Sequence, residues 1–283
     1  MVALLDTHQH LLYANDLPYS WTADFPALAG RAFTLEDYKR GSAGRDIKAT
    51  LFMEADVDEA RRLEEAPFIA AIAKQPGSGL AGLISNLRPE NDSGFEAELE
   101  RADELGIVGF RRILHVMGDP LSQSSPFRGH VRKLGAAGKT FDMCFLARQL
   151  PVARDLAKAC ENTRLILDHC GVPDIAGGGL DPWRADISAL AALPNVTCKL
   201  SGLLAYCRPD AATLDSIRPY VDHVLEAFGP QRMIWGSDWP VVTVTSDLPT
   251  WIDITQEILG ALSPDEAEAI GSANAVQVYG LDG

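Results

Sequence analysis

Two histidines two positions apart, His8 and His10, lie in the first extended segment of the chain, LLDTHQH. Side chains two apart on a β-strand point to the same side, so both imidazoles can face one point. Neutral imidazole is a common ligand of divalent metals. The pair therefore indicates a metal site or a catalytic centre, although two core histidines bonded to their neighbours would show the same spacing.

An acid with suitable placement ends the segment RMIWGSD near the end of the chain. Strand alternation puts Gly236 and Asp238 on one side and Trp235, Ser237 and Trp239 on the other. We expect Asp238 to point inward, where a carboxylate beside histidines can bind a metal, take a proton from water, or do both. The alternative is a structural aspartate that caps the following turn.

A third histidine, His169, follows the segment RLILD. It shares a strand face with Leu165 and Leu167, so it is expected to line the active-site mouth if these leucines fill the interior. A buried core histidine remains the alternative. Asp168 has the opposite parity, and we expect it to face the helices and to cap or pair there.

Several cations are candidates for binding a substrate. Arg111 and His115 share one face of the segment IVGFRRIL and its continuation, and an arginine in a cleft is a rigid fork for a carboxylate, carbonyl or hydroxyl. Arg112 has the opposite parity and could equally be a surface ion-pair residue, so it is set aside as a candidate. Lys199 could steady developing negative charge, or it could be a lysine that is simply paired within the fold.

Eight short aliphatic or β-branched runs alternate with longer amphipathic segments, a pattern typical of βα units around a parallel sheet. The runs span residues 3–9, 47–54, 79–85, 107–114, 139–145, 164–170, 195–201 and 232–238. They predict a (β/α)8 TIM barrel that forms a single domain over residues 1–283. The residues above lie at strand C-terminal ends, where such barrels place their chemistry. Glu54, at the end of the second run, could complete a metal site with His8, His10 and Asp238, or could anchor the histidines from behind.

The charge and composition of the chain limit the classes of molecule that it is expected to bind. A formal net charge of −14 argues against nucleic acid and anionic membranes, and favours a small-molecule substrate. No apolar stretch approaches the roughly 20 residues of a membrane span, and no signal-like N-terminus is present, so we expect a cytoplasmic protein. The five cysteines form no CxxC pair and are expected to be reduced thiols. A homo-oligomer is left open.

A long connection follows the first run, over residues 11–33, and carries Trp21. Connections of this length often bind ligands. We expect Trp21, with Trp239 and Tyr206, to form the rim of a pocket and to pack against a sugar ring, although ordinary core or surface packing is an equal alternative.

The motifs, taken in order, resemble the amidohydrolase superfamily and in particular its lactonase branch. The similarity runs over almost the whole chain and includes DTHQH, GFR, LDHCGVPD followed by PW, NVTCKLSGL, WGSDWPV and SANAVQVYGL. The forms KLSGL and SDWPV look most like the sugar lactonases that open L-fucono- or L-rhamnono-lactone, and relatives open pyrone dicarboxylate or muconolactone rings.

By this resemblance His8 and His10 match the strand-one pair, His169 the strand-six histidine and Asp238 the strand-eight acid. The chain departs from the wider superfamily because the fifth run, FDMCFLA, has no histidine and the fourth has no lysine for a carboxylated bridge. A binuclear centre is therefore not expected. The lactonase branch shares this loss, and its members differ in their need for metal. One divalent ion, Zn or Mn, and metal-independent catalysis both stay open.

The resemblance implies a hydrolase that opens a lactone ring with an activated water. In this hypothesis Asp238 takes the proton, His8 and His10 assist with or without a metal, and His169 and Arg111 polarise the carbonyl and place the ring. One alternative is a metal-dependent non-oxidative decarboxylase of a small acid, although such enzymes usually also use a strand-five histidine. Another is a catalytically silent barrel that binds a sugar acid.

Overall fold

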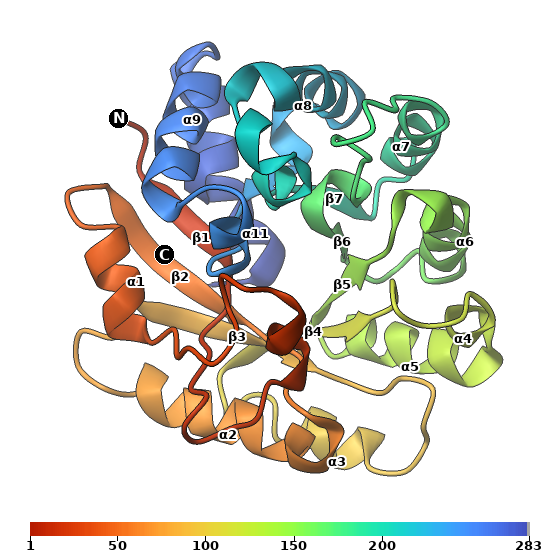
Figure 1. Ribbon diagram of the computed structural model, residues 1–283. Helices are drawn as coiled ribbons and strands as arrows, with labels where there is room; N and C mark the ends of the chain where they lie inside the picture. The colour runs from red at the N-terminus through yellow and green to blue at the C-terminus, as the bar shows by residue number, and fades with distance from the viewer. Residues whose placement is uncertain (282–283) are drawn as a thin grey trace.

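The computed structural model describes residues 1–281, and the last two residues of the expected domain, 282–283, lie outside the described part. Eight parallel strands pair in chain order, and helices surround them (Figure 1). The strands are β1 (Leu4–Gln9), β2 (Ile47–Met53), β3 (Leu80–Asn86), β4 (Ile107–Ile113), β5 (Thr140–Cys144), β6 (Leu165–Leu167), β7 (Val196–Leu200) and β8 (Met233–Trp235). The predicted TIM barrel is confirmed.

Most of the helices fill the connections between strands, as repeated βα units require, and those from residue 248 onward follow β8. The helices are α1 (Leu35–Gly41), α2 (Arg62–Ala73), α3 (Phe95–Glu100), α4 (Pro120–Gln123), α5 (Ser125–Ala136), α6 (Leu150–Ala159), α7 (Trp183–Ala191), α8 (Leu214–Phe228), α9 (Leu248–Gly260), α10 (Pro264–Glu268) and α11 (Asn274–Tyr279). Two short 3-10 helices matter for the site: η1 (Ser20–Asp24) in the long first connection and η5 (Leu203–Tyr206) after β7. Among residues 1–281, no helix combines the length and hydropathy that crossing a bilayer requires.

The first and last strands meet through hydrogen bonds just beyond the end of β8. The backbone N–H of Asp238 donates to the carbonyl of His8 at 2.9 Å, and the N–H of His10 donates to the carbonyl of Trp239 at 2.7 Å. The carboxylate of Asp6 accepts from the N–H of Ser237 at 2.7 Å. The nearly closed barrel thus brings the two ends of the sequence together at the residues singled out for chemistry.

The hydrophobic core consists of two clusters, one inside the barrel and one between the strands and the helices. One apolar cluster joins side chains from strands on different sides of the ring, which can meet only inside the barrel; its members are Leu5, Leu51, Met53, Ile84, Ile166, Ile234, Ala275 and Tyr279. Leu165 and Leu167 belong instead to the larger cluster between strands and helices. The premise that these two leucines fill the interior is therefore wrong, because the inward residue of β6 is Ile166.

All five cysteines are free and buried, as expected.

Asp6 does not join the site, because its other carboxylate oxygen accepts from the hydroxyl of Tyr38 on α1 at 2.7 Å. Of the alternating polar residues Asp6, His8 and His10, only the two histidines enter the site. The strand's register is irregular between Asp6 and Gln9, which breaks the simple alternation.

Candidate active site

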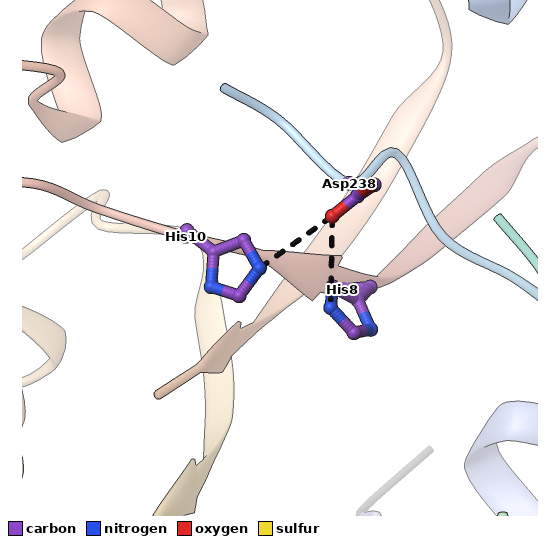
Figure 2. Close-up of side chains that lie close together, drawn as sticks. All are labelled: His8, His10 and Asp238. Atoms are coloured by element: carbon purple, nitrogen blue, oxygen red, sulfur yellow. Dashed lines mark ion pairs between the residues drawn. The ribbon is translucent and has the colours of Figure 1, made fainter. Parts of the chain in front are cut away.

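His8, His10 and Asp238 converge on one point (Figure 2). Asp238 Oδ1 lies 3.5 Å from His10 Nε2 and 3.8 Å from His8 Nε2, and all three side chains are buried. His10 Nδ1 is 3.0 Å from the carbonyl oxygen of Met53, which can only accept a hydrogen bond. The ring therefore carries a proton on Nδ1 and turns Nε2 toward Asp238. Two imidazoles and a carboxylate within 4.8 Å of one another fit a divalent metal.

The far side of the His8 ring rests on a buried ion network. His8 Nδ1 lies 3.4 Å from Asp168 Oδ1 and 3.3 Å from Lys199 Nζ. Lys199 also contacts Asp142 Oδ2 at 2.6 Å and Asp168 Oδ1 at 3.0 Å. Burial alone would raise the pKa of Asp168, but Lys199 and His8 hold it well below its usual value. Burial and the positive charge of Lys199 lower the pKa of His8, which favours the neutral ring that a metal requires.

The prediction that Asp168 faces the helices is wrong. Its strand face is that of Ile166, which points into the barrel, so Asp168 enters the site by ordinary alternation. His169 then turns inward as well, because β6 ends at Leu167 and the backbone of His169 is left-handed, with φ 53°. Such a conformation is costly for a residue other than glycine and clusters at functional sites.

The same left-handed conformation occurs at Asp238, with φ 55°, three residues after the end of β8. His169 Nδ1 lies 2.9 Å from Ser201 Oγ, which fixes its ring. A Cβ on Gly202 would lie 2.6 Å from the same nitrogen, so only glycine fits there, at φ 70°. The sharp turns after β6, β7 and β8 are thus shaped around these side chains.

Arg111 and Glu54 form a buried pair at the side of the site. Arg111 Nε donates to Glu54 Oε1 at 2.6 Å, and Nη2 donates to the Glu54 carbonyl at 2.7 Å. Burial would raise the pKa of Glu54, but Arg111 brings it below its usual value. Arg111 Nη1 is 3.3 Å from His8 Nε2. This geometry favours Glu54 as an anchor for Arg111 over Glu54 as a fourth metal ligand.

A cavity of about 500 Å³ opens above these groups. Arg111, His115, His169 and Asp238 line it, together with apolar residues of the surrounding loops; the wall includes Trp21, Phe25, Ile113, Val116, Tyr206, Val241 and Val244. Burial and nearby Arg111 lower the pKa of His115 to about 4, so this ring is neutral at pH 7. Its Nδ1 lies 3.1 Å from Cys144 Sγ.

The rim is partly as expected. Trp21 and Tyr206 line the cavity, and Trp21 Nε1 donates to the Ala55 carbonyl at 2.8 Å, which ties the long first connection to β2. Trp239 is buried against Phe33 and Tyr38 instead.

Lys199 does not reach the cavity. Its ammonium is fully buried and paired with Asp142 and Asp168, so the structure gives it a supporting place beneath the site, where a substrate does not pass. Asp142 was missed in the sequence, although an acid inside the apolar run of the fifth strand was a signal. Arg112 pairs with Glu90 at 2.9 Å.

The model of the Amidohydrolase family matches residues 5–281. The chain belongs to the Amidohydrolase family. Its His8, His10, His169 and Asp238 gather at one end of the barrel, as the resemblance implied.

The relatives of this Amidohydrolase member include lactonases. An L-fucono-1,5-lactonase of Burkholderia multivorans is 29% identical over 98% of this chain and 96% of its own length. An L-fucono-1,5-lactonase of Burkholderia ambifaria is 36% identical, over 50% of each chain. A crystal structure of an amidohydrolase from Burkholderia multivorans with bound zinc superposes with a TM-score of 0.90 at 26% identity, and covers 99% of this chain and 100% of that one.

Gly236 tests how closely β8 must approach β1 to form this site. A Cβ at this position would lie 2.7 Å from the His8 Cβ and 3.2 Å from its backbone nitrogen. We expect Gly236→Ala to destabilise the fold by about 1–3 kcal/mol through overpacking, measured as a lower urea midpoint. The control is Gly129→Ala in α5, where nothing lies within 4 Å; it should be neutral or stabilising. Equal midpoints for the two variants would contradict this prediction.

Proposed function

We propose that the protein hydrolyses a lactone of a sugar acid to the open hydroxy acid. The observation that carries the proposal is the carboxylate of Asp238, held 3.5 Å from His10 and 3.8 Å from His8 at the floor of a cavity with an apolar wall. A carboxylate in this place can accept a proton from a water above it. Both relatives, the one similar over nearly its whole length and the one similar over half, are named as lactonases, which supports the lactone ester bond as the bond that is broken.

In this mechanism the water oxygen bonds to the lactone carbonyl carbon as Asp238 takes the water proton. His169 Nδ1 lies 2.9 Å from the hydroxyl of Ser201. With that hydroxyl as the donor, His169 carries its proton on Nε2 and donates it as a hydrogen bond to the carbonyl oxygen. The ring C–O bond then breaks, and Asp238 returns its proton to the departing alkoxide. The sum is one lactone and one water giving one hydroxy acid. Arg111, fixed by Glu54, orients the ring.

His8, His10 and Asp238 would hold the divalent metal that their geometry fits. When bound, such an ion supplies Lewis-acid polarisation and a lower pKa for water. We propose zinc, because the similar amidohydrolase of Burkholderia multivorans carries zinc. Catalysis by the preorganised cations and imidazoles alone is the competing mode.

A panel of sugar-acid lactones, assayed with a pH indicator, tests the reaction. The proposal expects acid release from at least one neutral 1,5- or 1,4-lactone at a rate far above its spontaneous opening. Carbon dioxide release from small aromatic acids would instead favour a decarboxylase. Ligand-dependent thermal stabilisation without acid release would favour a silent binding protein.

Chelation tests the metal. Removal of zinc should lower both turnover and the thermal midpoint, and zinc added back should restore both, because an ion bound only to the folded state stabilises it. In His10→Ala the midpoint should no longer respond to zinc, since one of the three ligands is gone. Full activity in protein shown by elemental analysis to be free of metal would contradict the metal-dependent mode.

A further inference from the structure

A second group of candidate ligand atoms adjoins the first. His8, Asp168 and His169 each offer one ligand atom within 4.8 Å of the others, and all three residues are buried. His8 belongs to both groups. Within residues 1–281, neither carboxylate oxygen of Asp168 has a partner with hydrogen-bond geometry. Two imidazoles and a buried carboxylate are a donor set that a divalent cation accepts.

Two positive charges already face this place: Arg111 Nη1 lies 3.6 Å from Asp168 Oδ2, and the ammonium of Lys199 lies closer. Lys199 Nζ lies 3.0 Å from Asp168 Oδ1 and 3.3 Å from His8 Nδ1, and its side chain is fully buried. Asp142 holds the ammonium from the other side at 2.6 Å, and the hydroxyl of Tyr279 donates to the same oxygen of Asp142 at 3.0 Å. The lysine is therefore fixed against the ligand atoms that a second ion would need. Its charge would also repel that ion at short range in a dry interior.

We propose that the Lys199 ammonium stands in for a second divalent cation and limits this centre to the single ion of His8, His10 and Asp238. β4 has no lysine for a carboxylated bridge and β5 has no histidine, so neither strand supplies the ligands of a binuclear centre. The structure adds that a second donor set exists, on β1 and after β6, and that a lysine from β7 closes it. This inference concerns metal stoichiometry and does not depend on which bond the enzyme breaks.

The experiment counts zinc ions in three variants that all carry Asp142→Asn, so that loss of the lysine leaves one buried carboxylate fewer. The first keeps Lys199; the second adds Lys199→Ala, which opens the space; the third adds Lys199→Met, which fills it without charge. Each protein is incubated with excess zinc, passed through a desalting column and measured by elemental analysis. Circular dichroism and the thermal midpoint establish that each is folded.

The proposal expects about one zinc per chain when Lys199 is kept and about two in the alanine variant. A second ion in the alanine variant alone supports exclusion by occupied space, and a second ion in both lysine-free variants supports exclusion by charge. Adding Asp168→Asn to the alanine variant should return it to about one ion. The proposal is overturned if the folded alanine variant binds no more zinc than the variant that keeps the lysine.

The wild-type protein supplies a second measurement that does not depend on the folding of any variant. In crystals soaked with excess zinc, an anomalous difference map at the zinc edge should show one peak, between His8, His10 and Asp238. A further peak of comparable height beside Asp168, with Lys199 displaced, would overturn the proposal.

Discussion

Asp238→Asn is expected to remove turnover almost completely while the barrel stays folded. An amide has no basic oxygen for the water proton, and general-base catalysis typically contributes about 10²–10⁴-fold in rate. The side chain is almost the same size, and the backbone N–H of Asp238 still bonds to the His8 carbonyl, so the loop after β8 should keep its shape. The measurement is kcat on the best lactone of the panel, together with the thermal midpoint.

Asp24→Asn is the matched control, because Asp24 lines the same cavity but belongs to neither group of candidate metal ligands. It should lower kcat by less than about 10-fold. The zinc content of Asp238→Asn separates its two roles: a variant that retains zinc and loses turnover identifies the carboxylate as the base. A wild-type rate in Asp238→Asn would remove Asp238 from the mechanism.

Lys199→Met should cause the largest loss of stability of any single change beneath the site. It leaves Asp142 and Asp168 buried without their shared ammonium, and breaking a buried ion pair from one side costs about 3–5 kcal/mol. Burial raises the pKa of Asp142 to about 6 even with Lys199 beside it, and removal of the lysine raises that pKa further.

A raised pKa means that the folded variant keeps a proton which the unfolded chain releases. The stability of Lys199→Met should therefore fall as the pH rises above about 4, through the raised pKa of Asp142, and the deficit relative to wild type should be larger at pH 8 than at pH 5. Urea unfolding at the two pH values measures this difference. Lys199→Met/Asp142→Asn should regain part of the loss. A single variant within about 0.5 kcal/mol of wild type at pH 8 would contradict the prediction.

The architecture was readable from the sequence because its signal is repetitive. Eight apolar runs, each followed by an amphipathic segment, leave few alternatives to a βα barrel, and six of the eight observed strands have ends within one residue of the predicted ones. The two others, β6 and β8, are shorter than predicted, at three residues each. Both stop shortly before a catalytic candidate with a left-handed backbone, two residues before His169 and three residues before Asp238. Local alternation carries no information about such a turn.

The residues of the site could be predicted from the sequence, but the buried residues that support them could not. His8, His10, His169 and Asp238 are recognisable as polar residues at predicted strand ends. The parity of β6 was misassigned because all three of its residues are aliphatic, so either face could be the interior. Asp142, Asp168 and Lys199 meet only after the barrel closes, since they come from the region of three different strands. Pairing across a closed sheet is a tertiary property that no window of sequence contains.

Helix α11, at the end of the described chain, contacts the buried ion network beneath the site. Tyr279 of α11 enters the barrel from behind and places its hydroxyl on Asp142, one ion pair away from the ring of His8. Substitutions in α11, or a fusion partner attached to it, would therefore disturb the buried ion network that supports His8. Metal affinity and turnover, and not merely yield, are the properties in which such a change should first be noticed.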